Sequence, residues 1–192
     1  MFKELSLSGK KIILTRSQDQ LSDSQILFEK NGADVYDLPS LMIGPPDDWR
    51  PVDDALEKID IFDWIIFSSA NGVINIEDRL NQMDCSLSEV SKRIKISAVG
   101  RKTANLLNLT GAKISFVPPK FIADSLIQHF PEKTEGLKFF IPRVQSGGRS
   151  LLAESFRSNG AEVIEVAAYE SCCPDHIPQK TLEALNQKNI DV

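Results

Sequence analysis

The sequence has few cysteines and no long apolar run, so it lacks the features that indicate a disulfide framework, a structural zinc site or a membrane span. Only three of its 192 residues are cysteines, Cys85, Cys172 and Cys173, and their spacing suits neither zinc binding nor a set of disulfides. The opening MFKELSLSGKK has no apolar signal-peptide core, and apolar runs such as Trp64 to Phe67 are too short to cross a bilayer. We therefore expect a cytoplasmic protein that is neither secreted nor embedded in a membrane.

Candidates for several common chemistries are also missing. The two histidines have no persuasive partner, because His129 lies in a helical apolar pattern and His176 lies beside a proline. The segment from Gly100 to Thr103 lacks the glycine spacing of a phosphate loop or a dinucleotide fingerprint. No basic run is interleaved with aromatic residues. The pattern favours neither a nucleotide-dependent enzyme nor a nucleic-acid-binding protein.

Charge is unevenly distributed along the chain. The total is −5, but residues 92–149 hold eleven Lys or Arg and only three acids, a balance of +8, so the remainder carries −13. A basic block within an acidic chain can focus positive potential on an anionic partner. A solvated, lysine-rich surface explains the same block equally well.

Short β-branched or aromatic runs alternate with stretches of helical period. Apolar residues recur at intervals of three and four between residues 52 and 59 and between residues 123 and 130, which indicates helices with one buried face. Strands separated by helices of this length indicate βαβ units and parallel sheets, hence the α/β class. The expected strands cover residues 12–15, 35–38, 64–67, 94–99, 113–117, 138–141 and 163–169.

One supersecondary unit is repeated. The motif ILTR at 13–16 leads to NGA at 31–33, IPR at 141–143 leads to NGA at 159–161, and a looser copy runs from AVG at 98–100 to TGA at 110–112. The glycine of each copy suits the end of a helix, so the chain reuses a strand, helix, Gly-Ala, strand unit, most simply in two related halves.

Two proline-containing segments suggest how the halves are connected. We expect residues 38–51 and 167–178 to cross between lobes, since prolines there interrupt helices and central strands. Residues 1–37 and 179–192 then form a discontinuous first lobe, and residues 52–166 form the second.

Small polar residues follow two of the expected strands. Ser68, Ser69, Asn71 and Gly72 come after the strand at 64–67, and Gly100 and Thr103 come after the strand at 94–99. Such residues can cap a helix, and the same geometry exposes N–H and O–H donors to a carboxylate at the carboxyl ends of parallel strands.

Three longer side chains stand at comparable positions. Arg143 and Arg149 flank a glycine-rich turn and could each grip a carboxylate through a planar fork, although solvated surface arginines are the alternative. Tyr169 ends a long strand immediately before the second crossing, which would direct its phenol towards the space between the lobes.

The ordered motifs ILTR, NGA, FSSANGV, ISAVGRKTA, FIPR with GGRSLL, and NGAEVIEVAAYES resemble the uroporphyrinogen-III synthase family over essentially the whole chain. The resemblance implies two flavodoxin-like parallel-sheet lobes joined by a two-stranded linker. It also implies a cofactor-free, monomeric enzyme that acts on a small polycarboxylate, with no metal, no nucleic acid and no membrane partner.

The reaction implied by the resemblance is ring closure of hydroxymethylbilane, with inversion of ring D, to uroporphyrinogen III. The substrate has eight carboxylates, which the basic residues between 92 and 149 could bind. Tyr169 matches the family's candidate proton donor for the departing hydroxyl. The alternative is a non-catalytic bilobal module that binds a small anion. The residues expected to bind substrate are Arg16, Ser68, Ser69, Asn71, Gly72, Gly100, Thr103, Arg143 and Arg149.

The last residues, Asn189 to Val192, resemble Ile61 to Trp64, which lead into the strand at 64–67. We therefore expect the first lobe to lack a C-terminal part that longer family members have. A lobe with an exposed sheet edge and an incomplete core should be poorly stable or weakly active. A cooperative thermal transition together with full synthase turnover would contradict this expectation.

Overall fold

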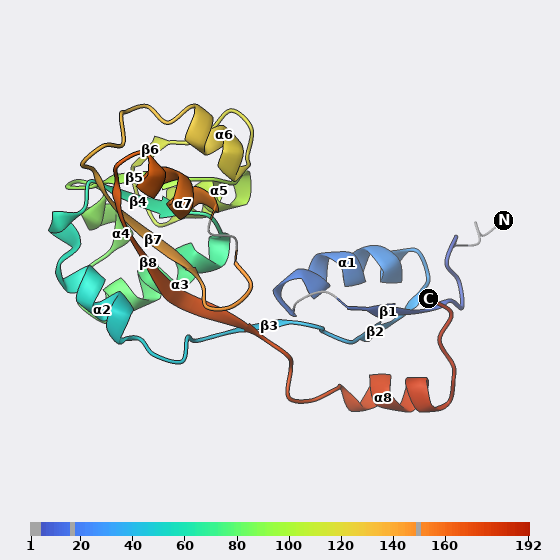
Figure 1. The fold of residues 1–192 in the computed structure, drawn as a ribbon. Helices are drawn as coiled ribbons and strands as arrows, with labels where there is room; N and C mark the ends of the chain where they lie inside the picture. Colours follow the sequence, from blue (N-terminus) through green and yellow to red (C-terminus); the bar gives the residue numbers. More distant parts are fainter. Residues whose placement is uncertain (1–4, 16–17, 149–150) are drawn as a thin grey trace. The chain divides into compact units, whose positions relative to one another are not determined.

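The computed structural model describes residues 5–15, 18–148 and 151–192 and contains two compact units. One comprises Met1–Gly44 with Ser171–Val192, and the other comprises Pro45–Glu170. Parallel strands and helices make up both (Figure 1), so the predicted α/β class is confirmed. The finer assignment of two lobes and two linker crossings stays a prediction. No helix in the described part of the chain has the length and apolar character needed to span a membrane.

The smaller unit is built on two parallel strands. Its elements are β1 (Lys11–Leu14), α1 (Gln18–Lys30), β2 (Asp34–Asp37), β3 (Met42–Gly44) and α8 (Gln179–Asn186). Strands β1 and β2 pair in parallel, and a small core forms around Ile12 and Val35. Gly32 ends α1 with φ +91°, a conformation that favours glycine. The Thr181 hydroxyl donates to the Asp37 carbonyl at 2.7 Å, which ties α8 to β2.

The likeness between residues 189–192 and 61–64 extends to their hydrogen bonds. The Asp191 N–H donates to the Lys11 carbonyl at 2.8 Å, and its carboxylate accepts from the Lys11 N–H at 2.8 Å. In the larger unit, Asp63 forms the same two bonds with Lys138, at 2.9 and 2.8 Å. The hydrogen bond from the Lys11 N–H, with a smaller contribution from Lys10, lowers the pKa of Asp191. An aspartate therefore forms the same pair of hydrogen bonds with the first residue of a neighbouring strand in both units, with Lys11 of β1 and Lys138 of β7.

The larger unit alternates strands and helices through most of its length. The sheet that includes its strands has the order β3-β8-β7-β4-β5-β6, and the described pairings between β8, β7, β4, β5 and β6 are parallel. Its elements are α2 (Arg50–Glu57), the 3-10 turn Ile59–Ile61, β4 (Trp64–Phe67), α3 (Ala70–Asn81), α4 (Leu87–Val90), β5 (Lys95–Ala98), α5 (Arg101–Leu109), β6 (Ile114–Phe116), α6 (Ala123–Gln128), β7 (Lys138–Val144), α7 (Leu151–Ser158) and β8 (Glu162–Cys172).

The segment expected to be a linker at 38–51 contains regular structure. Strand β3 lies inside it, and α2 already begins at Arg50. Pro51 occupies the first turn of α2, where its fixed φ suits the helix and its missing N–H is not needed. Proline there starts an element rather than only ending one, which the sequence analysis did not anticipate.

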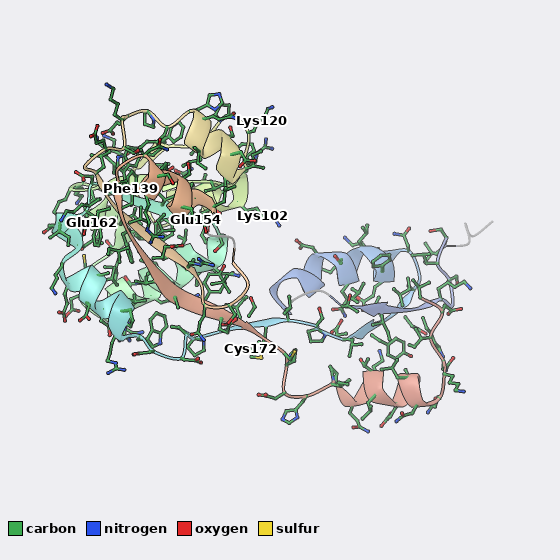
Figure 2. The ribbon with its side chains drawn as sticks, in the orientation of Figure 1. Lys102, Lys120, Phe139, Glu154, Glu162 and Cys172 are labelled. Atoms are coloured by element: carbon green, nitrogen blue, oxygen red, sulfur yellow. The ribbon has the colours of Figure 1, made fainter. Side chains whose placement is uncertain are left out.

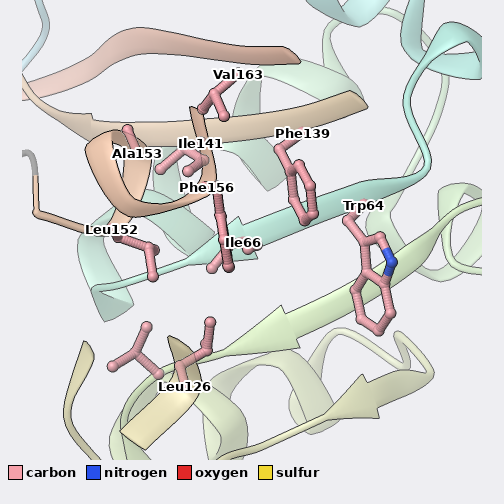
Figure 3. Close-up of a cluster of buried hydrophobic side chains, with 10 residues drawn as sticks. Trp64, Ile66, Leu126, Phe139, Ile141, Leu152, Ala153, Phe156 and Val163 are labelled. Carbon is pink, nitrogen blue, oxygen red and sulfur yellow. The ribbon is translucent and has the colours of Figure 1, made fainter. Parts of the chain in front are cut away.

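Both faces of the central strands are buried. On one face, helices α6 and α7 cover alternate strand residues, and Figure 3 shows Phe139, Phe156, Ile66 and Leu126 within this cluster. The rings of Phe139 and Phe156 stack with centroids 4.6 Å apart. Helix α3 contacts both β4 and β7 and also packs against α5. All four residues of β4 are buried, as expected for a central strand of a parallel sheet.

Replacing Phe156 with alanine should lower the free energy of unfolding of the larger unit by about 3–5 kcal/mol, because it leaves a cavity against Phe139. The two tryptophans, Trp49 and Trp64, both belong to this unit, so their fluorescence in a urea titration reports its unfolding. Leu109→Ala is the matched control because Leu109 is 83% exposed, and it should change the midpoint little. Equal shifts for the two variants would contradict the assigned core.

Candidate active site

The parallel strands of the larger unit bring several polar residues to one edge of the sheet. Since β4, β5, β7 and β8 run in the same direction, the loops that follow them lie at their common carboxyl edge. A cavity of about 260 Å³ opens there, and it combines an apolar wall with a few polar groups, as ligand sites do. Its lining residues are Ser68, Val99, Ala123, Ile141, Arg143, Leu152, Ala153 and Glu165.

Ser69 and Tyr169 meet in this part of the molecule. Ser69 is the N-cap of α3, and its Oγ accepts a hydrogen bond from the Gly72 N–H at 3.0 Å. The Tyr169 hydroxyl donates to the same Oγ, also at 3.0 Å. Tyr169 is buried, with 8% of its surface exposed, whereas Ser69 is half-buried. Two residues selected from the sequence, 100 positions apart, therefore form one hydrogen-bonded pair.

An irregularity in β8 determines where Tyr169 points. Arg143 pairs with Ala167, but Val144 pairs with Tyr169, so Ala168 is an extra residue opposite β7. In a regular strand, Tyr169 would share a face with Glu165, which lines the cavity beside α7. The extra residue shifts the alternation by one and turns the phenol to the face of α3. The pattern at residues 163–169 predicts a regular strand that ends at Tyr169, whereas β8 continues to Cys172 and contains this shift.

Helix α3, which carries Ser69, is held against α2. Arg79 donates from Nε and Nη2 to the two carboxylate oxygens of Asp53, at 2.5 and 2.6 Å. This hydrogen bonding raises the pKa of Arg79 above its usual value. A two-pronged bond between partly buried groups gives geometric precision as well as attraction. The ion pair therefore secures the helix that Ser69 caps.

Asn71 and Gly72 lie in the first turn of α3. The Asn71 carbonyl accepts from the Asn75 side chain at 2.9 Å. The Gly72 N–H is already bonded to Ser69, and this makes Gly72 part of the cap. Ser68, the preceding residue, is exposed and lines the cavity. Of these neighbours, Ser68 has the geometry best suited to direct contact with a ligand.

Gly100 and Thr103 lie at the start of α5. Gly100 is its N-cap, and Thr103 follows in the first turn with only 3% of its surface exposed. The first N–H groups of a helix have no partner within it, so this end favours negative charge. Because Thr103 is buried, its hydroxyl is not exposed for direct contact with a carboxylate.

Arg143 is bonded within a small charge network. Its Nη1 donates to Glu165 at 2.9 Å and its Nη2 donates to the Gly148 carbonyl at 2.6 Å, while Arg157 donates to the other Glu165 oxygen at 3.0 Å. Arg143 thus anchors the turn that follows β7. Glu165 is not among the site residues predicted from the sequence, although an acid within the otherwise apolar strand at 163–169 is a signal for it.

The other residues considered from the sequence add no further group to this site. Arg16 and Arg149 lie outside the described residues. His129 ends α6, where its Nδ1 is 2.9 Å from the Ser125 carbonyl, and His176 is exposed. Within residues 5–15, 18–148 and 151–192, no group of His, Cys, Asp or Glu has the arrangement of a metal site.

The basic block is divided between the two edges of the sheet. Lys92, Arg93, Lys95, Lys113, Lys133 and Lys138 precede or begin strands β5, β6 and β7, at the amino edge. Several are paired there, as Lys95 is with Glu132 at 2.6 Å. Of the basic residues of this block that the structure describes, only Arg101, Lys102, Lys120 and Arg143 lie at or near the carboxyl edge.

Two exposed lysines at the carboxyl edge, Lys102 and Lys120, have charges that no acidic side chain of the described residues neutralises. In the described part of the chain, neither Lys102 nor Lys120 forms an ion pair. Figure 2 shows Lys102 on the opposite side of this unit from Glu162, the first residue of β8. Arg101 lies over the ring of Phe121, 4.7 Å from its centroid. The carboxyl edge therefore combines cationic and apolar groups.

Comparison with known proteins connects this geometry to one family. A family model described as uroporphyrinogen-III synthase HemD matches residues 22–192. The uroporphyrinogen-III synthase of Synechococcus elongatus is 42% identical over 189 residues, which cover 98% of this chain and 71% of that protein.

Solved structures agree with the fold. A crystal structure of a mutant uroporphyrinogen III synthase from Thermus thermophilus covers 95% of this chain and 71% of its own, with a TM-score of 0.68 at 16% identity. The uroporphyrinogen-III synthetase of Helicobacter pylori covers 92% of this chain and 68% of its own, with a TM-score of 0.56 at 17% identity. The resemblance read from the motifs is confirmed, and the chain belongs to the uroporphyrinogen-III synthase family.

Proposed function

We propose that this chain converts hydroxymethylbilane to uroporphyrinogen III, closing the tetrapyrrole ring with inversion of ring D. Family membership supports this activity. The observation within the molecule that carries the proposal is the Tyr169–Ser69 pair at the carboxyl edge of the sheet. The pair offers a phenolic proton donor held by a hydrogen bond, and the family chemistry calls for a proton donor of this kind. We assign the protein to the cytoplasm, as a monomer acting on a small polycarboxylate.

The reaction begins when the terminal hydroxyl leaves ring A as water and an azafulvene cation forms. The substituted α-carbon of ring D attacks this cation, the spiro intermediate reopens, and the ring closes at the unsubstituted α-carbon on the other side of the ring D nitrogen. The overall change is the loss of one water without net oxidation, so it needs no redox cofactor. Uncatalysed closure gives the uninverted isomer, and the enzyme's main task is to orient the reacting rings.

Tyr169 supplies the proton for the departing hydroxyl in this proposal. A tyrosine phenol carries its proton at neutral pH, and general acid catalysis by a positioned side chain accelerates such a step. The Tyr169 hydroxyl is positioned by its bond to Ser69. The phenol is therefore held in one orientation, which reduces the motion needed to reach the transition state.

The substrate's carboxylates have several partners at the same edge. Ser68 offers an exposed hydroxyl in the cavity, and the first turns of α3 and α5 offer positive helix ends. Lys102 and Lys120 add exposed positive charge. The apolar wall of the cavity suits the faces of the pyrrole rings. Arg143 contributes through the turn it anchors as well as through its charge.

The isomer of uroporphyrinogen formed from hydroxymethylbilane tests the activity directly. With this chain present, type III should exceed the type I that forms spontaneously, because the enzyme controls which carbon of ring D attacks. The products are separated by chromatography and compared with a heat-inactivated sample. Unchanged type I together with saturable binding of the substrate would support the rival, a non-catalytic module that binds a small anion.

Removing the phenolic hydroxyl tests the proton donor. Tyr169→Phe should lower kcat on the order of 100-fold while KM changes little, since the ring remains and only the acid is lost. The second tyrosine, Tyr36, belongs to the smaller unit and supplies the matched control. Tyr36→Phe should leave kcat unchanged. Full turnover by Tyr169→Phe would exclude the assigned role.

The division of the basic block makes a further test of substrate binding. Lys102→Gln and Lys120→Gln should each raise KM roughly 2- to 5-fold at low ionic strength, with a smaller effect in 0.5 M salt, because each removes positive charge near a polyanion. Lys113→Gln removes the same charge at the amino edge and serves as the control. A similar rise in KM for all three variants would show that net charge alone matters.

A further inference from the structure

The hydroxyl of Ser69 has its acceptor capacity filled. A serine oxygen has two lone pairs and one hydrogen, so it can accept two hydrogen bonds and donate one. The Gly72 N–H and the Tyr169 O–H both donate to Ser69 Oγ, each at 3.0 Å. The Ser69 hydroxyl can then form one more hydrogen bond, as a donor. The two bonds that it accepts determine the direction in which this O–H points.

The two residues differ in their access to the surroundings. Tyr169 has 8% of its surface exposed, and its phenolic O–H already donates a hydrogen bond to Ser69 Oγ. Ser69 is half-buried and directly follows Ser68, which lines the cavity. Ser69 is therefore the more accessible residue of the pair. The phenol could act directly only by breaking its bond to Ser69.

We propose that Ser69 is a catalytic residue that relays the proton from Tyr169 to the departing hydroxyl of the substrate. This inference rests on the proposed function and gives Ser69 a role beyond helix capping or carboxylate binding. As the C–O bond of ring A breaks, the Ser69 O–H bond breaks and its proton joins the leaving oxygen to form water. Ser69 Oγ takes the proton of Tyr169 at the same time, which leaves a phenolate.

The proton balance closes later in the same turnover. Final ring closure at ring D releases one proton from the carbon that forms the new bond, and this proton returns through Ser69 to the phenolate. Neither residue is changed after one cycle, and no oxidant or reductant is needed. The transient negative charge lies at the N-terminus of α3, a helix of 12 residues, whose positive end stabilises an anion.

The cap is therefore part of the chemistry in this proposal. The Gly72 N–H keeps Ser69 Oγ at the start of α3, and the extra residue in β8 turns Tyr169 towards it. A cap alone needs only an acceptor oxygen, which asparagine or aspartate also provides. A relay needs an oxygen that accepts one proton and gives up another, which among the good capping residues means serine or threonine.

Four variants of the full chain separate the relay from the cap. Ser69→Asn keeps a capping group but has no hydroxyl, and Ser69→Thr keeps both. The double variant Ser69→Asn with Tyr169→Phe tests whether the two residues act as one unit. Ser86 caps α4 in the same way, with Oγ accepting from the Glu89 N–H, so Ser86→Asn is the matched control for replacing a cap.

The measurements are type III formation, kcat and KM, with turnover also followed in mixtures of H₂O and D₂O. We expect Ser69→Asn to lower kcat at least 10-fold with little change in KM, Ser69→Thr to stay within a few-fold of the parent, and Ser86→Asn to match the parent. The double variant should be no slower than Tyr169→Phe alone. The parent's rate should depend on the deuterium fraction with a curvature that indicates two protons in flight.

The failures of the two proposals are distinguishable. A parent chain that makes no excess of type III overturns the proposed function and the relay with it. A parent that makes type III, with an Ser69→Asn variant of equal kcat, overturns the relay alone. Losses that multiply in the double variant, or a linear dependence on deuterium, also overturn it, because both results indicate that the residues act separately.

Discussion

The parallel alignment of β8, β7, β4 and β5 is the constraint on which the candidate site depends. Parallel strands must be joined by crossings over the faces of the sheet, so each strand ends at the same edge and each following loop begins there. Ser68, Gly100 and Arg143 come from distant parts of the chain and reach this edge for the same geometric reason. The position of the site therefore follows from the direction of the strands, and the side chains determine only its chemistry.

Local deviations from that regular frame give the site its specific contacts. A regular β8 would place Tyr169 with Glu165 beside α7, whereas the extra residue at Ala168 places it at the cap of α3. The acid that remains on the α7 face then holds Arg143 and Arg157. One inserted residue in the pairing therefore separates a charge network from a hydroxyl pair within a few residues of the same strand.

Charge is organised by the same strand direction. The described Lys and Arg residues of the stretch 92–149 fall at both edges of the sheet, because the loops of a parallel sheet alternate between its amino and carboxyl ends. Three pairs at the amino edge, such as Lys138 with Glu162, neutralise part of the block. The smaller cationic set at the carboxyl edge is the part available to a carboxylate ligand there. A sum of charges along the sequence cannot make this distinction.

Much of this protein could be predicted from its sequence. The α/β class, most strand positions and the family follow from periodicity and ordered motifs, because burial on both faces of a parallel sheet requires apolar runs of this kind. The residues Ser69 and Tyr169 could be selected for their types and their places at strand ends. Only the tertiary structure decided that they meet, that Thr103 is buried and that Arg143 is bound to Glu165. Strand register and the extra residue in β8 depend on the pairing partner, and that partner is distant in the sequence and leaves no local signal.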